Sequence, residues 1–188
     1  MTPSKARTLR LLVLWVGLAA LTGAAQTANA AKARPAGGGG VMAPIHQFTD
    51  DFNKGDIAGA KADNADVVSI VDDFSPHLWT GPGAYDTWLA GLITDDKARG
   101  ETGEKVILGA TVRFKVGGDT AYVVTRATDT YKQHGKKMAA PGEWTFALHN
   151  VGGAWKITAW TWSGGAAHAV LAAAKSTAAP AAAPAAKP

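Results

Sequence analysis

The second half of the chain contains four long segments in which apolar and polar residues alternate, joined by short turns. Over 106–116, for example, every second residue from Val106 to Val116 is apolar or alanine. Such alternation predicts β-strands that bury one face. The other predicted strands lie over 121–131, 143–150 and 155–163. Because the turns between these strands are short and rich in glycine, we expect an antiparallel meander that packs one face against a core.

Helical patterns precede these strands. Apolar residues at steps of three and four over 41–52 predict an amphipathic helix, and Asp56 is placed to cap a short second helix over 57–62. A second apolar stripe, which predicts the third helix, begins at Tyr85, after Gly81-Pro82-Gly83, and ends near Gly100. The β-branched segment 67–71 predicts a short strand between the helices. This order of elements predicts an α+β roll in which three N-terminal helices pack inside a curved, mostly antiparallel sheet.

The two ends of the chain differ in composition from its middle. Basic residues, an apolar run over 11–21 and the sequence Ala28-Asn29-Ala30 are typical of a cleaved signal peptide over 1–30. We therefore expect export to the periplasm or the medium, without stable membrane insertion. Segment 31–40 contains four consecutive glycines and is predicted to be a flexible linker. Segment 166–188 is rich in Ala and Pro and is predicted to be a disordered tail with possible helix only over 167–175.

Charge and residue types exclude several function classes for the predicted domain, 41–165. All 15 acidic residues lie within it, whereas seven of the 19 basic residues lie outside, so the domain carries a small negative net charge. Nucleic-acid binding needs a clustered basic surface and is not expected. The chain has no Cys, which excludes disulfides and thiol catalysis. The five His residues have no metal-ligand spacing, and we expect neither a metal site nor a cofactor.

Four segments together resemble the nuclear transport factor 2-like superfamily, in particular its SnoaL-like and ketosteroid-isomerase-related branch. These segments are Phe52-Asn-Lys-Gly-Asp56, the strand Val67 to Asp73, Trp79-Thr-Gly-Pro-Gly83 and Trp155 to Ser163. The resemblance implies a cone-shaped roll with a pocket at its open end. It also implies that the open sheet face forms a homodimer surface.

The same resemblance suggests roles for two residues. Steroid isomerases of this branch place a general-base Asp just after the first strand, and that position falls on Asp72, with Asp73 adjacent. They place an oxyanion-donating Tyr on the first helix, and that position falls on Phe48, which has no hydroxyl. The resemblance therefore supports Asp72 as a base and supplies only half of the isomerase machinery.

The residues themselves leave several alternatives open. Because adjacent strand residues point to opposite faces, one of Asp72 and Asp73 can face the pocket while the other faces solvent. His77 is either a proton shuttle beside Asp72 or a solvated loop residue. Arg126 either pairs with Asp72, anchors an acidic ligand or faces outward on the sheet. The remaining candidates for a ligand pocket are aromatic side chains, which otherwise fill the core: Phe48, Trp79, Trp88, Tyr122, Trp144 and Trp160.

Three functions fit these features. The first is an exported module that binds a small apolar or aromatic molecule in the conical pocket. The second is an isomerase, hydrolase or dehydratase with Asp72, helped by His77, as its catalytic group. The third is a dimerising interaction module that acts through its sheet. We expect the first, because the oxyanion-donating Tyr is missing.

Overall fold

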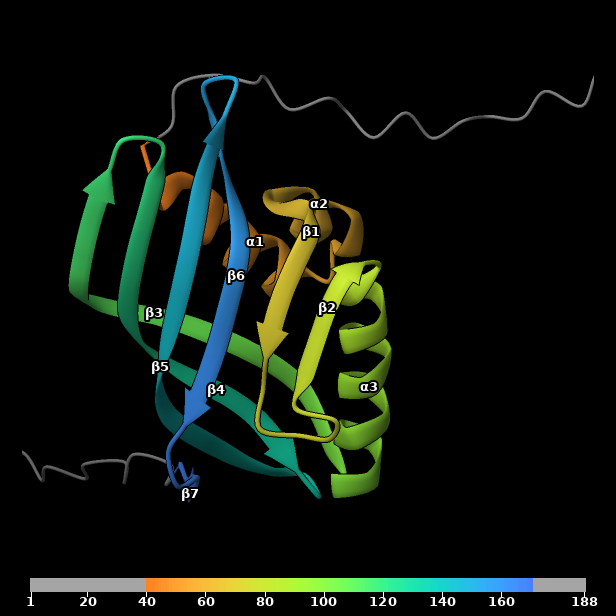
Figure 1. The fold of residues 1–188 in the computed structure, drawn as a ribbon. Helices are drawn as coiled ribbons and strands as arrows, with labels where there is room; N and C mark the ends of the chain where they lie inside the picture. The colour runs from red at the N-terminus through yellow and green to blue at the C-terminus, as the bar shows by residue number, and fades with distance from the viewer. Residues whose placement is uncertain (1–39, 171–188) are drawn as a thin grey trace, which may run out of the picture. The chain divides into compact units, whose positions relative to one another are not determined.

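The computed structural model describes residues 40–170, which form three helices and a seven-stranded sheet (Figure 1). The predicted signal peptide, the predicted linker up to residue 39 and the predicted tail from residue 171 onward lie outside the described residues. Within 40–170, no helix is long and apolar enough to cross a membrane.

The three predicted helices are confirmed, and local signals fix their ends. They are α1 Met42–Lys54, α2 Ile57–Asp63 and α3 Ala84–Arg99. The side chain of Asp56 caps α2 by accepting a hydrogen bond from the backbone N–H of Gly59 at 2.9 Å. Helices α1 and α3 both end at a glycine with positive φ, Gly55 and Gly100, a conformation that glycine adopts without strain.

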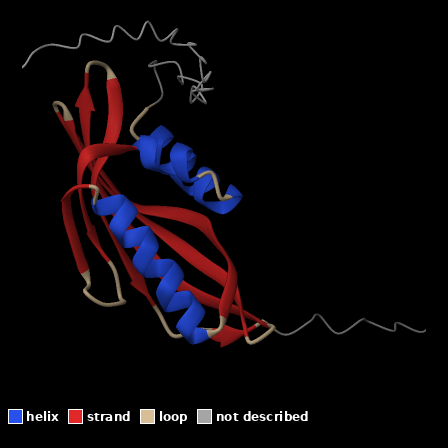
Figure 2. Cartoon of the chain, turned by 90° about the vertical axis from the view of Figure 1, so that its right-hand side faces the viewer, coloured by secondary structure: helices blue, strands red, loops and turns tan. Residues whose placement is uncertain are grey.

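The sheet is curved, mixed and open, with the helices on one side of it (Figure 2). Its strand order is β2-β1-β6-β5-β4-β3, in which β1 and β6 are parallel and the other neighbours are antiparallel. The strands are β1 Asn64–Val71, β2 Leu78–Pro82, β3 Glu101–Gly117, β4 Thr120–Gln133, β5 Lys136–Val151, β6 Ala154–Gly164 and β7 His168–Ala169. The predicted roll and its four-stranded meander are therefore confirmed, and the strands are longer than the alternation alone indicated.

Two strands differ from the sequence prediction. Leu78–Pro82 forms β2, an edge strand antiparallel to β1, although its Gly and Pro residues indicated a break. Proline is tolerated there because an edge strand need not donate every backbone hydrogen bond. The strand β7 lies where a helix was thought possible, because β6 pairs with β5 only as far as Gly142 and leaves the next part of β5 free for His168 and Ala169.

The side chain of Asn53, at the end of α1, forms hydrogen bonds with backbone groups on the free edge of β3. Its Nδ2 donates to the carbonyl oxygen of Val106 at 2.7 Å, and its Oδ1 accepts from the N–H of Val106 at 2.8 Å. Since β3 is the last strand of the sheet, these backbone groups have no neighbouring strand on that side. One amide side chain thus joins the first helix to the edge strand that carries one wall of the pocket described below.

We expect Asn53→Ala to lower the free energy of unfolding by about 2–4 kcal/mol, because it leaves two polar groups of a buried residue unpaired. Urea denaturation measures the change. Asn150→Ala is the matched control, since the side chain of Asn150 accepts a single exposed hydrogen bond from Gly153. A loss at Asn53 no larger than that at Asn150 would show that the edge contact contributes little.

Candidate functional site

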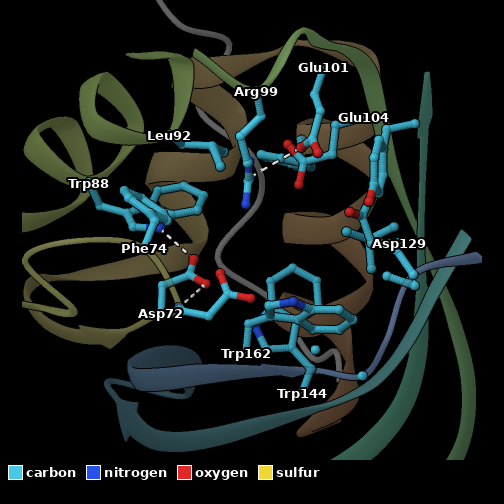
Figure 3. Close-up of a pocket in the computed structure, with 18 of the residues that line it drawn as sticks. Asp72, Phe74, Trp88, Leu92, Arg99, Glu101, Glu104, Asp129, Trp144 and Trp162 are labelled. Atoms are coloured by element: carbon cyan, nitrogen blue, oxygen red, sulfur yellow. Dashed lines mark hydrogen bonds and ion pairs between the residues drawn. The ribbon is translucent and has the colours of Figure 1, made fainter. Parts of the chain in front are cut away.

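A pocket of about 230 Å³ lies between α3, the end of β1 and the first part of β3 (Figure 3). Its walls combine two kinds of side chain. The aromatic ones are Phe52, Phe74, Trp88, Trp144, Trp160 and Trp162, together with Tyr131. The ionisable ones are Asp72, Asp73, Arg99, Glu101, Glu104 and Asp129. A cavity with this lining suits a small molecule that has a flat apolar part and polar groups.

Asp72 is the first residue after β1, and its carboxylate is fixed in the pocket wall. Trp88 Nε1 on α3 donates to Asp72 Oδ2 at 2.8 Å, and the backbone N–H of Asp73 donates to Asp72 Oδ1 at 2.8 Å. Asp72 is only 8% exposed. Burial raises the pKa of the Asp72 carboxyl to about 6, against the two hydrogen bonds, which lower it.

Two further carboxyl groups line the opposite wall. Glu104 lies at an irregularity in β3, where the register with β4 shifts by one residue next to Gly103. Burial, followed by the charge of Asp129, raises the pKa of Glu104 to about 9. Burial, followed by the charge of Asp96, raises the pKa of Asp129 on β4 to about 7. These raised pKa values favour the protonated form of Glu104 at neutral pH and bring the titration of Asp129 close to neutrality.

Arg99, the last residue of α3, points into the pocket in Figure 3. Its Nη2 lies 3.0 Å from Asp95, 3.5 Å from Asp96 and 3.1 Å from Glu101. The guanidinium is therefore surrounded by acids of its own helix and of the start of β3. Among the described residues that line the pocket, Arg99 is the only one with a basic side chain.

Close packing at two glycines sets the position of Trp162. A Cβ atom at Gly142 would lie 2.7 Å from the Trp162 ring, and one at Gly164 would lie 2.9 Å from its Nε1. A side chain at either position would therefore push the indole out of its place in the wall. The oxygen Asp73 Oδ2 lies near the same point, 3.4 Å from the Cβ position of Gly164.

The structure brings together half of the residues that the sequence suggested for a site. Asp72 and Asp73 both line the pocket, although only Asp72 is buried. Trp88, Trp144 and Trp160 line it too. Their rings contact one another, since the Trp88 and Trp160 centroids are 4.8 Å apart and those of Trp144 and Trp160 are 5.7 Å apart.

The structure places the other five candidates elsewhere. Phe48 is completely buried behind the pocket, against Trp144 and Trp160, and Trp79 packs on Phe74. The side chain of His77 is exposed, and its backbone closes the turn after β1 through hydrogen bonds with Asp72 and Phe74. Tyr122 and Arg126 are exposed on β4, where they alternate with the buried residues Ala121, Val123, Thr125 and Ala127.

Sequence reasoning missed Arg99, Glu101, Glu104 and Asp129. The position of Asp129 could have been inferred, because it continues the alternation of Ala121, Val123, Thr125 and Ala127, which form the buried face of β4. Gly103, directly before Glu104, could have indicated the irregularity that turns this acid toward the core. No local pattern predicts that the end of α3 meets these two strands.

Several solved structures share the fold of this chain, although their sequence identity to it is low. A ketosteroid isomerase-like protein from Erwinia carotovora atroseptica SCRI1043 shares 17% identity with a TM-score of 0.52, covering 66% of this chain and 92% of that one. The hexachlorocyclohexane dehydrochlorinase LinA-type3 from Novosphingobium barchaimii LL02 shares 8% identity with a TM-score of 0.58, covering 68% and 85%. A nuclear transport factor 2 superfamily protein from Salmonella enterica shares 15% identity with a TM-score of 0.54, covering 65% and 87%.

These likenesses show the fold alone. A search of curated proteins found no match. The model of the SnoaL-like domain family matches residues 41–167, almost the whole of the described region. The chain therefore belongs to the SnoaL-like domain family.

Proposed function

We propose that the pocket binds a small aromatic molecule and that Asp72 removes a proton from one of its carbon atoms. The observation that carries this proposal is the state of Asp72. Its carboxylate is buried at the edge of an aromatic cavity, held by Trp88 and the amide of Asp73, and has its pKa raised to about 6. A carboxylate of this pKa is mostly ionised at pH 7 and is a stronger base than an exposed aspartate.

The two hydrogen bonds also fix the orientation of the Asp72 carboxylate. Trp88 occupies Oδ2 and the Asp73 amide occupies Oδ1, so the carboxylate cannot rotate freely. Each oxygen keeps a second lone pair for a proton from the ligand. The names of two similar structures, an isomerase-like protein and a dehydrochlorinase, describe conversions that move or remove hydrogen and so agree with this chemistry.

A nitrobenzisoxazole is a suitable probe for this activity, because it is flat, aromatic and neutral. A base removes the C–H proton of its five-membered ring, the N–O bond breaks and a coloured nitrile phenolate forms. We expect the full-length protein to open this ring with saturation kinetics and faster per carboxylate than acetate does at the same pH. A rate equal to that of acetate, without saturation, would contradict the proposal.

A second candidate is ligand binding without turnover, and Phe48 favours it. The resemblance places an oxyanion donor on the first helix, but Phe48 has no hydroxyl and is enclosed by Tyr85, Trp144 and Trp160. An enolate would find no donor there. In that case the probe would bind and quench the tryptophan fluorescence but would not be opened.

We also propose that the protein is an exported homodimer. A row of apolar side chains on β3, namely Val112, Phe114 and Val116, is 42–50% exposed beyond the helices and supports pairing of two copies through the sheet. Sedimentation of the purified domain tests the dimer, and a monomer at micromolar concentration would contradict it.

Export rests on the signal-peptide pattern of residues 1–30, and the N-terminal sequence of the mature protein tests it.

A further inference from the structure

We infer that the ligand of this pocket carries a positively charged nitrogen, as a protonated amine or a quaternary ammonium group attached to its aromatic part. The inference rests on the proposed function, since it names the class of molecule that the same pocket takes. It concerns the wall formed by β3 and β4, which lies opposite Asp72 and has no part in the proton transfer proposed above.

The first argument is the balance of charge around the cavity. Within the described part of the chain, five carboxyl side chains line the cavity, whereas Arg99 is the only basic one. Arg99 is already surrounded by Asp95, Asp96 and Glu101 at 3.0–3.5 Å. Glu104 and Asp129 line the same cavity, and neither forms an ion pair with a basic side chain among residues 40–170.

The second argument comes from buried polar atoms that have no partner. Asp129 Oδ1 is buried and accepts no hydrogen bond from any described residue. Trp144 is only 4% exposed, and its Nε1 has no acceptor within the described part of the chain. Both side chains line the pocket. Because such atoms are costly to leave unpaired, the cavity suits an occupant that donates to Asp129 and offers an electronegative atom to Trp144.

The aromatic walls favour an organic cation over a metal ion. The side chains of Trp88, Trp144, Trp160 and Trp162, together with Tyr131, line the same cavity as the acids, and aromatic rings attract cations. Within 40–170, no group of three or more His, Asp or Glu side chains is placed to hold a metal ion. A site that binds an amine combines aromatic rings, which stabilise the cation, with carboxylates, which pair with it, and this cavity has both.

Burial favours the protonated form of both acids. The groups that act on the Glu104 pKa are Asp129 from β4, Asp96 and Arg99 from α3, and Asp72 after β1, and only Arg99 favours ionisation. Those that act on Asp129 are Asp96, Glu101, Arg99 and the amide of Thr130. An incoming cation favours the ionised carboxylates, so binding should release protons at neutral pH.

The test compares three probes of nearly equal shape: protonated benzylamine, neutral benzyl alcohol and anionic benzoate. Binding to the full-length protein at pH 7 is followed by quenching of tryptophan fluorescence. We expect benzylamine to bind at least about tenfold more tightly than benzyl alcohol, and benzoate to bind most weakly. Calorimetry in two buffers of different ionisation enthalpy should show proton release with benzylamine and none with benzyl alcohol.

Variants identify the wall responsible. Glu104→Gln and Asp129→Asn should each weaken benzylamine binding about tenfold or more, and should leave benzyl alcohol binding unchanged. Asp119→Asn is the matched control, because Asp119 is an exposed acid in the turn between β3 and β4. If a pocket variant fails to fold, the probe preference and the proton release of the wild-type protein decide the question.

Equal binding of benzylamine and benzyl alcohol, or a preference for benzoate, would overturn the inference. Binding of Ca²⁺ or Mg²⁺ alone that Glu104→Gln abolishes would also overturn it, in favour of a metal site. The neutral nitrobenzisoxazole separates this test from that of the proposed function. Its turnover without an amine preference would leave Asp72 as the base, whereas amine binding without turnover would support only the ligand class.

Discussion

Asp72→Asn is expected to lower the rate of nitrobenzisoxazole opening by a factor of about 100 or more, because it removes the proposed base. Asparagine has nearly the same volume, and its carbonyl oxygen can still accept the hydrogen bond from Trp88 Nε1. The fold should therefore be retained, which circular dichroism and the urea midpoint would verify. Saturation kinetics of ring opening at pH 8, where Asp72 is ionised, measure the effect.

Two further variants distinguish the loss of the base from a general effect of mutation on the protein. Asp66→Asn changes an exposed acid on β1, the strand that precedes Asp72, and should leave the rate unchanged. Trp88→Phe removes a hydrogen bond that lowers the Asp72 pKa, so the pH at which the rate is half-maximal should move upward. An Asp72→Asn variant as fast as the wild-type protein would exclude Asp72 as the base.

The second large effect is a loss of stability as the pH rises. The pKa values of Asp72, Glu104 and Asp129 are all higher in the folded protein than the ordinary values of 3.8 and 4.5. The folded state therefore binds more protons than the unfolded state between about pH 4 and pH 9. The stabilisation is complete below the ordinary pKa and is lost as the pH rises through each folded value. We thus expect the free energy of unfolding to fall from pH 5 to pH 9.

Glu104 should dominate this dependence, because its pKa is raised furthest among the three, to about 9. One group contributes a slope of at most about 1.4 kcal/mol per pH unit, so Glu104→Gln should stabilise the protein at pH 9, relative to pH 5, by about 2–5 kcal/mol. Urea denaturation at pH 5, 7 and 9 measures it, with Glu143→Gln, at an exposed position, as control. A wild-type stability that is constant over this range would contradict the raised pKa values.

The fold could be predicted from the sequence because each helix and strand buries one face, which gives its apolar residues a regular spacing. The four alternating segments and the two apolar stripes all have to bury an apolar face, and a roll of helices against a curved sheet buries them in one core. Deviations occurred where pairing rather than periodicity decides the structure. Leu78–Pro82 forms a strand because it pairs with β1, and His168–Ala169 forms one because it pairs with the free part of β5.

The site was less predictable than the fold for a physical reason. Asp72 and the tryptophans are found from one strand end and from composition, but Glu104 depends on an irregularity that changes which way its side chain points. Tyr122 and Arg126 were candidates because of the chemistry of their side chains, although they alternate with Ala121, Val123, Thr125 and Ala127, which form the buried face of β4. Which acids share a cavity depends on where the end of α3 meets β3 and β4, and no short segment contains that information.

The most direct test of the central claim is the pH dependence of kcat/KM for ring opening by the wild-type protein. If Asp72 is the base, kcat/KM should rise with pH, reach half its maximum near pH 6 and be level by pH 8, since the rate follows the ionised fraction of the buried carboxyl. A half-maximum near pH 4 would mean that the catalytic group is an ordinary exposed carboxylate. A rate proportional to hydroxide across the whole range would mean that the protein supplies no base.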